Sequence, residues 1–381
     1  MPNFKELQIP PQYQLITTNQ QLAEVCQRAR EFAVVALDTE FERIRTLHPK
    51  LGLIQLYAAD QVALIDPLAI DDPQPLIDLL ADENVLKVLH SSREDLEAFL
   101  HYYQQLPTPF MDTQVMARFL NFPMSTGFAK LIKHYFDLDL DKGASRTDWL
   151  ARPLSDVQLE YAAADVWYLL PLYQQMLQLL EQTPWLAAAQ EESASLLDIR
   201  SRVHSPVELA YLDISNAWRL TQVELMRLKL LAQWRMEEAI ERDLALNFII
   251  REEHLLAVAQ NNPKSVSELI RLNLRNVEIR HYGKKLLQIL NKAQKAEKNE
   301  YPPKIIRACD DKRYKPVIDK LRDELEQITP ANLPRDLVAS RRNLDGLVKW
   351  HWFALDELPT LLTGWRKTYG ERLLEILKTF D

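Results

Sequence analysis

Two carboxylates stand at the end of an apolar segment near the start of this chain. In "VVALDTE", residues 34–40, Asp38 and Glu40 are two residues apart. In a β-strand this spacing puts both side chains on the same face. Two like charges this close repel each other, so solvent, a shared proton, a basic partner or a metal ion must offset the repulsion.

Two further places carry acids that a fold could bring to the same point. Asp95 opens a predicted helix directly after the apolar segment "VLKVLH". It therefore lies at the carboxyl end of a strand, where sheets flanked by helices tend to place their sites. Tyr161 and Asp165 are four residues apart in "LEYAAADVWYLL" and share one helix face. The three alanines that precede Asp165 are small and would let this helix approach a sheet closely.

A set of four carboxylates without a thiolate or imidazole ligand suits hard cations such as Mg²⁺ or Mn²⁺. A pair of such ions about 4 Å apart is the arrangement that drives phosphodiester hydrolysis, one preparing the attacking water and the other stabilising the leaving oxygen. A tyrosine has an ordinary pKa near about 10, so we expect Tyr161 to orient that water rather than to remove its proton. Taken singly, Asp95 also fits a helix N-terminal acid, and Tyr161 with Asp165 fits an ordinary helix face.

The segments that must position these residues predict a domain that mixes sheet and helices. Apolar periodicity predicts strands over 32–40, 51–59 and 61–67, close enough for an antiparallel meander, and a further strand over 84–92. Five segments show helical periodicity: residues 19–30, 93–103, 113–120, 126–136 and 155–181. Ser155 is the expected N-cap of the helix over 155–181.

Beyond residue 205 the sequence predicts helices only. We expect domains over residues 1–205, 206–293 and 300–381, with a charged, proline-containing linker in "NKAQKAEKNEYPPK". The segments that start at Leu274 and Leu361 align without gaps and share a Tyr-Gly pair and a Leu-Leu-x-Ile-Leu ending. This indicates a repeat, although two amphipathic helix ends can also match by chance.

Composition excludes several classes of protein. Of 381 residues, 47% are hydrophobic and 26% charged, which is ordinary for a globular protein. No basic segment followed by an apolar run opens the chain, and we expect a cytoplasmic location. The two cysteines, Cys26 and Cys309, lie in no CxxC pattern, so neither a disulfide framework nor a thiolate zinc site is expected. Only 7 glycines are present and none forms a phosphate-binding GxGxxG or GxxxxGK[ST] motif.

The net charge of -8 conceals an asymmetry. Residues 1–204 carry 16 Lys and Arg against 28 Asp and Glu, and residues 205–381 carry 30 against 26, so the two parts have net charges of -12 and +4. The acidic part argues against a simple basic nucleic-acid cleft unless some of its acids hold cations. The second part can supply the attraction for phosphate.

Three motifs, "DTEFER", "HSSREDLEAF" and "DWLARPLSDVQLEYAAADVWYLLPLY", carry a resemblance when taken in this order. Together they resemble the DEDD superfamily of 3′-to-5′ exonucleases in its tyrosine-containing branch, and within it the ribonuclease D family. The resemblance implies a ribonuclease H-like α/β nuclease domain, a mixed sheet with helices, followed by two all-α domains of the HRDC type. The first helical segment has Val277 where the second has Gly364, and such domains usually show a glycine-containing turn there. We therefore expect no backbone contact with nucleic acid at that turn of the first segment.

The resemblance also implies roles for individual residues. The metal ligands would be Asp38, Glu40, Asp95 and Asp165, holding two divalent ions, Mg²⁺ or Mn²⁺, and Tyr161 would orient the water. Four residues are candidates for substrate binding: Thr39, Phe41, Arg146 and Arg152. For Phe41 the alternative is packing in the core, and for Arg146 and Arg152 it is an ordinary exposed position.

The implied activity is that of a monomeric exoribonuclease, acting away from membranes on structured RNA such as tRNA precursors and releasing nucleoside 5′-monophosphates. RNA as the substrate rests on the resemblance alone. The alternative enzymatic function is that of a DNA 3′-to-5′ exonuclease. Contacts to the 2′-hydroxyl decide between RNA and DNA, and the sequence does not show them. The alternative non-enzymatic function is that of a nucleic-acid-binding protein with an inactive nuclease-like domain, but such a protein would typically lack one of the four acids.

Overall fold

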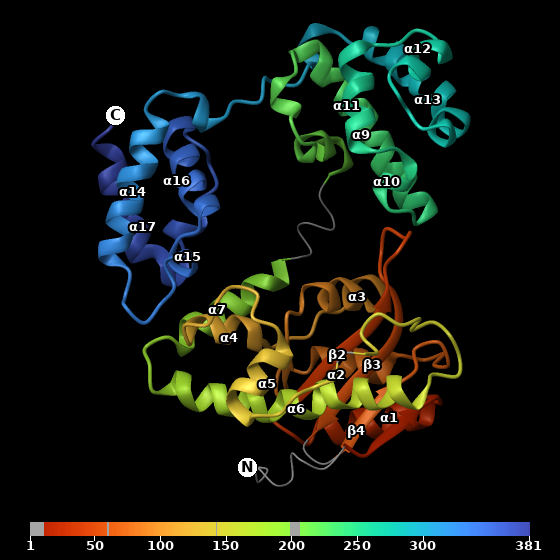
Figure 1. The fold of residues 1–381 in the computed structure, drawn as a ribbon, viewed down its shortest axis with the longest axis vertical. Coiled ribbons are helices and arrows are strands. Elements are labelled where there is room, and N and C mark those ends of the chain that lie inside the picture. Colours follow the sequence, from red (N-terminus) through yellow and green to blue (C-terminus); the bar gives the residue numbers. More distant parts are fainter. Residues whose placement is uncertain (1–10, 59–60, 142, 199–205) are drawn as a thin grey trace. The chain divides into compact units, whose positions relative to one another are not determined.

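A computed structural model describes residues 11–58, 61–141, 143–198 and 206–381. Its first part is built on a six-stranded mixed sheet in the order β1-β4-β3-β2-β5-β6 (Figure 1). Strands β2, β3 and β4 form an antiparallel meander, while β1 pairs parallel with β4, β5 with β2, and β6 with β5. The strands are β1 Tyr13–Ile16, β2 Val34–Glu42, β3 Lys50–Ala58, β4 Gln61–Ile65, β5 Leu86–Leu89 and β6 Phe110–Asp112.

Helices lie between and after these strands. The long helix α6 starts at the predicted N-cap Ser155, whose hydroxyl accepts a hydrogen bond from the Gln158 backbone in a capping box. The helices are α1 Asn19–Ala29, α2 Gln74–Ala81, α3 Arg93–Tyr103, α4 Thr113–Phe119, α5 Phe128–Phe136, α6 Asp156–Glu181 and α7 Leu186–Ala194, with the 3₁₀ turn η2 Ser195–Asp198.

The predicted mixed architecture, the meander and the fourth strand are confirmed. Four elements, β1, β6, α2 and α7, were not predicted from the sequence. The end of the strand predicted over 51–59 lies outside the described residues.

The two faces of the sheet have different partners. Val35 and Leu37 of β2 belong to the buried core that also contains residues of α1, α2 and α3. Alternate residues of a strand point to opposite faces, so Asp38 and Glu40 point away from that core. Helix α6 contacts β2, β3 and β4, and it covers the face on which the two acids lie.

The helical part of the chain contains no strand among its described residues, as predicted. Its longer helices, with the short turns between them, are as follows: η3 Val207–Asp213, η4 Ala217–Arg219, α9 Gln222–Arg242, α10 Leu246–Ile249, α11 Glu252–Asn261, α12 Val266–Arg271, α13 Asn276–Gln294, η5 Lys298–Glu300, η6 Ala308–Asp310, α14 Tyr314–Ile328, α15 Arg335–Val338, α16 Arg341–Phe353, η7 Thr360–Leu362, η8 Gly364–Arg366 and α17 Lys367–Lys378. Within the described ranges, no helix is long and apolar enough to cross a membrane.

The chain packs into two compact units. The first unit contains the sheet, helices α1 to α7 and Lys312–Asp381. The second unit contains the elements from η3 to η6 together with Arg43–His48, the connection between β2 and β3. In the second unit the backbone N–H of Ala245 donates to the Arg45 carbonyl at 2.9 Å, and Leu47 packs against the helical core.

Within the first unit, the turn around Gly364 joins the last helical segment to α7. The Trp365 backbone N–H donates to the Glu191 carboxylate at 3.0 Å, Arg366 forms an ion pair with Glu192, and the Trp365 ring packs edge-on against Phe119. Gly364 has a φ of +52°, and a Cβ there would lie 1.5 Å from Glu191 Oε1. The left-handed conformation favours glycine at this turn, and any larger residue would also displace the Glu191 carboxylate.

We predict that Gly364→Ala destabilises the protein by roughly 1 to 3 kcal/mol, because alanine strains a left-handed turn and displaces Glu191 from its hydrogen bonds. Urea unfolding measures the change. Gly346→Ala is the matched control, since Gly346 lies inside α16 and a methyl group added there would meet no atom within 4 Å. It should be neutral or stabilising by up to about 1 kcal/mol. Equal losses in both variants would contradict the docking role of Gly364.

Candidate active site

Strand β2 brings two acids to one face of the sheet. Asp38 lies opposite Gln55 of β3, and Glu40 lies opposite Leu53. The register then shifts: the next pair joins Phe41 to Leu51, which leaves one extra residue in β3. Such a β-bulge bends the strand and re-aims side chains, and bulges are frequent next to active sites.

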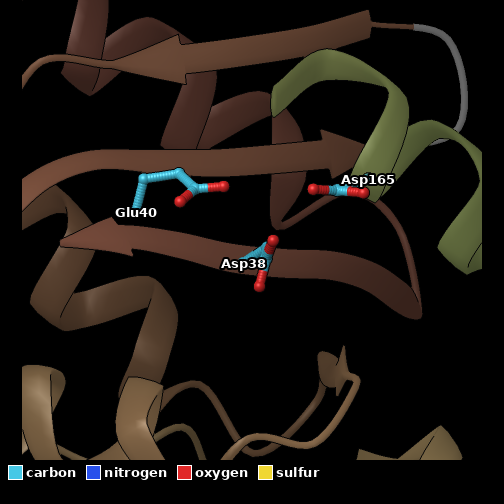
Figure 2. A group of neighbouring side chains, drawn as sticks. All are labelled: Asp38, Glu40 and Asp165. Atoms are coloured by element: carbon cyan, nitrogen blue, oxygen red, sulfur yellow. The ribbon is translucent and has the colours of Figure 1, made fainter. Parts of the chain in front are cut away.

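Helix α6 adds the third acid. Ala162 and Ala163 are fully buried, so small side chains lie where the helix meets the sheet, as the sequence predicts. Asp165 offers a carboxylate oxygen that lies, with one oxygen each from Asp38 and Glu40, in a group whose members are all within 4.8 Å of one another. Figure 2 shows the three carboxylates, two from the sheet and one from the helix, directed at a common space.

Asp95 lies beside this group but outside it. It is buried in the first turn of α3, and the hydroxyl of Thr39 donates to its Oδ1 at 2.5 Å. Thr39 points to the opposite face of β2 from its acidic neighbours and is itself buried. Its hydroxyl therefore holds Asp95, and the substrate contact predicted for Thr39 stays a prediction.

Burial governs the protonation of all four acids, and repulsion from the other acids adds to it for Asp38 and Glu40. Burial, and after it the charges of Asp95 and Asp165, hold the pKa of the Asp38 carboxyl well above its usual range. Burial and the charge of Asp165 raise the pKa of Glu40 to about 9. Burial also raises the pKa of Asp95 and that of Asp165 to about 7. Without a cation, these groups resist ionisation near neutral pH.

Tyr161 lies one helical turn before Asp165 on the same face of α6, and the charge of Asp165 acts on its hydroxyl. Burial and the surrounding carboxylates raise the pKa of the Tyr161 hydroxyl far above its ordinary value. The hydroxyl therefore stays protonated and can act as a hydrogen-bond donor. A hollow of about 160 Å³ opens beside it, lined by Tyr161, Asp165 and Ala144 among others.

Gln55 is a residue of this site that the sequence analysis missed. It is fully buried on β3 directly opposite Asp38, and neither atom of its amide has a hydrogen-bond partner in the described part of the chain. Cross-strand neighbours of this kind have their side chains on one face. A polar residue in the middle of the apolar segment "LGLIQLYAA" was the available signal.

The donors at this site fit a hard divalent cation. Carboxylate oxygens are the ligands that Mg²⁺ and Mn²⁺ prefer, and a cation here would offset the repulsion that raises the pKa values of the acids. The unpartnered Gln55 amide also indicates a site made to hold further polar groups.

The other predicted substrate contacts have different surroundings. Phe41 is partly buried next to the bulge, and Arg146 is exposed. The side chain of Arg152, also predicted to contact the substrate, donates to Asp66 and to the backbone carbonyls of Gly52, Trp149 and Ala151. These contacts occupy the guanidinium, so they argue against a phosphate contact by Arg152.

Comparison with known proteins agrees with this arrangement. Residues 13–181 match a family model described as 3′-5′ exonuclease, residues 224–290 match the HRDC domain, and residues 313–374 match the ribonuclease D C-terminal HRDC domain. Ribonuclease D of Haemophilus influenzae is 50% identical over 98% of this chain and 95% of its own. That of Escherichia coli K12 is 45% identical over 96% and 97%.

Similarity extends to a solved structure. The crystal structure of Escherichia coli RNase D, described as an exoribonuclease involved in structured RNA processing, matches with a TM-score of 0.93 and 44% identity. The match covers 97% of this chain and 100% of that one.

We predict that Mn²⁺ affinity rises steeply with pH between about 6 and 9, because an ion must displace protons held at raised pKa values, about 9 for Glu40 and about 7 for Asp95 and Asp165. Calorimetric titration in buffers of different ionisation enthalpy measures both the affinity and the protons released. Glu40→Gln should abolish the part of the release that occurs near pH 9. An affinity that is independent of pH would contradict the assignment of these acids as ligands.

Proposed function

This chain is an exoribonuclease of the ribonuclease D family, and from this premise we propose that it trims the 3′ ends of structured RNA, such as tRNA precursors, and releases nucleoside 5′-monophosphates. The observation that carries the proposal is the convergence of Asp38, Glu40 and Asp165 at one point, with Asp95 beside them and Tyr161 lining the same hollow as Asp165.

We assign the four acids as ligands of two divalent ions, Mg²⁺ or Mn²⁺. When bound, such ions supply charge stabilisation for the attacking and leaving oxygens of an in-line displacement at phosphorus. The chain itself contributes the positions: β2 fixes Asp38 and Glu40, α6 fixes Asp165, and Thr39 orients Asp95 through its hydroxyl.

Tyr161 would orient the attacking water in this scheme. Burial and the neighbouring carboxylates raise the pKa of its hydroxyl, which favours a hydrogen-bond donor over a general base near neutral pH. A protonated hydroxyl can donate a hydrogen bond, and placing the water in line with the scissile bond requires only such a directional contact.

The first helical segment offers a surface for the body of the RNA. On α13, the exposed residues Val277, Arg280, Lys284 and Lys285 follow helical spacing and lie along one face. In the last helical segment the corresponding turn is occupied by its contacts with α7. We therefore assign phosphate contacts to the α13 face of the first segment.

The test of the proposed activity is the digestion of a 5′-labelled RNA that has a stem and a single-stranded 3′ extension. With Mg²⁺ or Mn²⁺ we expect stepwise shortening from the 3′ end down to the stem, release of nucleoside 5′-monophosphates, and no reaction in EDTA. A DNA of the same sequence should be shortened more slowly. Equal rates on both would favour a general exonuclease, and no shortening of either would overturn the proposal.

Two variants accompany this digestion. Asp38→Asn should abolish shortening, because it removes a ligand while it also relieves repulsion in the site. Tyr161→Phe should retain Mn²⁺ binding and lower kcat by roughly 10²-fold, the equivalent of about 2.7 kcal/mol in the barrier. Loss of Mn²⁺ binding in Tyr161→Phe would instead indicate a structural role for the tyrosine.

A further prediction concerns the α13 face. Replacing Lys284 and Lys285 by Gln should weaken RNA binding in the absence of metal and reduce the slope of log affinity against log salt by roughly 1 to 2, because fewer counterions are released. Lys320→Gln with Lys378→Gln removes the same charge from exposed positions of the last segment and should change the slope less. The assignment is wrong if both pairs change it equally.

A further inference from the structure

Arg152 occupies an unusual position for an arginine near a nuclease site. Its side chain is only 27% exposed and forms a two-pronged ion pair with Asp66, with Nε and Nη2 each 2.7 Å from a carboxylate oxygen. Asp66 directly follows β4 and is buried. This arrangement fastens the segment before α6 to the edge of the meander, and a planar guanidinium is suited to it because it matches a carboxylate in two directions.

The same guanidinium also reaches the bulge beside Glu40. Gly52 is the extra residue that the register shift leaves in β3, and its carbonyl accepts from Arg152 Nη2 at 2.6 Å. A Cβ at Gly52 would lie 2.5 Å from the Trp149 carbonyl oxygen. The backbone of Trp149 therefore lies directly against the bulge, and Arg152 Nη1 donates to the Trp149 carbonyl at 2.9 Å.

Trp149 connects this set of contacts to the proposed water-orienting residue. Its side chain is 1% exposed, and its ring centroid lies 6.2 Å from that of Tyr161. Its indole N–H has no hydrogen-bond partner among the residues that the structure describes. No polar contact of its own within that part of the chain fixes the indole, so its position depends on packing and on the tethers of the neighbouring backbone.

A second tether comes from α6. The amide of Gln158, in the first turn of that helix, donates to Thr147 Oγ1 at 3.0 Å and to the Asp148 carbonyl at 3.1 Å. The segment that carries Trp149 is thus held to the helix by Gln158 and to the sheet by Arg152. Tyr161 lies one turn further along the same helix and packs against the indole between these two attachments.

We propose that Arg152 is a positioning residue for catalysis: by fastening Trp149 to Asp66 and to the Gly52 bulge, it sets the position of the Tyr161 hydroxyl. This inference rests on the proposed role of Tyr161 in the hydrolysis. The hydrogen bonds of Arg152 go to Asp66, Gly52, Trp149 and Ala151 and to none of the four acids, so in this proposal its effect reaches the reaction through Trp149 and Tyr161.

The experiment measures kcat, KM and Mn²⁺ affinity for Arg152→Lys on the same labelled RNA. Lysine keeps the charge but loses the two-pronged geometry. We expect kcat to fall roughly 10- to 100-fold, as for a small misplacement of a catalytic group, with KM and Mn²⁺ affinity nearly unchanged. In a Tyr161→Phe background the same substitution should lower kcat by less than about threefold, because the hydroxyl it positions is already absent.

Two further variants reach the same contacts from other residues. Asp66→Asn keeps the size of the side chain but removes its charge and one of the two acceptor oxygens that Arg152 uses, and it should give a smaller loss of kcat with the same dependence on Tyr161. Gly52→Ala moves the Trp149 backbone, and with it two acceptors of Arg152, while it leaves the guanidinium itself in place, and it should reproduce the kinetics of Arg152→Lys. Arg30→Lys is the matched control, since Arg30 forms an ion pair with Asp82 at 2.7 Å on the surface and should leave kcat unchanged.

Each outcome decides between roles. An unchanged kcat in Arg152→Lys and Asp66→Asn overturns the inference, as do losses that multiply fully with that of Tyr161→Phe. A rise in KM alone would make Arg152 a substrate contact instead. The proposed activity is tested separately by the unaltered protein: if it shortens the RNA and Tyr161→Phe slows it while the Arg152 variants do not, only this inference fails.

Discussion

The burial of four neighbouring carboxylates is the constraint on which the rest of the nuclease part depends. The pKa values of Asp38 and Glu40 are raised chiefly by burial and then by the charges of their neighbours. An acid whose pKa is higher in the folded than in the unfolded state stabilises the fold less as pH rises through that interval. For Asp165 the interval runs from its ordinary value of 3.8 to about 7. The metal-free fold is therefore least favoured at the pH where the acids are needed as ligands, and a bound cation reverses this penalty.

The architecture opposes this repulsion with rigid surroundings. Strand β2 lies inside a six-stranded sheet with neighbours on both sides, so Asp38 and Glu40 cannot separate without breaking strand pairing. Helix α6 begins at a capping box and contacts the sheet through buried alanines, which fixes the depth of Asp165. Thr39 donates its hydroxyl to Asp95 from the other face of β2. The acids are thus held by three different elements, β2, α3 and α6, and the site exists only when all of them are packed.

The sequence located most of this candidate site because its signals are local. Alternation of apolar residues located β2, β3 and β4, and the spacing of Tyr161 and Asp165 placed both on one helix face. Strands β1 and β6 have only 4 and 3 residues, too short for alternation to be detected, and α2 has a proline as its N-cap. The ion pair of Arg152 was not predictable for another reason: its partner Asp66 is 86 residues away in the chain, and no local pattern distinguishes an arginine that binds phosphate from one that holds a loop.

The two helical segments share a sequence motif, but the motif does not show which copy packs against the nuclease part. Both contain a Tyr-Gly pair, yet a Cβ at Gly370 would lie 1.7 Å from the Leu361 carbonyl oxygen, whereas at Gly283 the nearest atom is a side-chain methyl 3.5 Å away. The second glycine is thus required by close backbone packing and the first is not. The turns that precede these glycines also differ between the two segments. In the last segment Gly364 lies close to α7, whereas in the first segment the corresponding residue, Val277, is 62% exposed. One copy of the motif packs against the nuclease part, and for this reason we assign the substrate contact to the other copy.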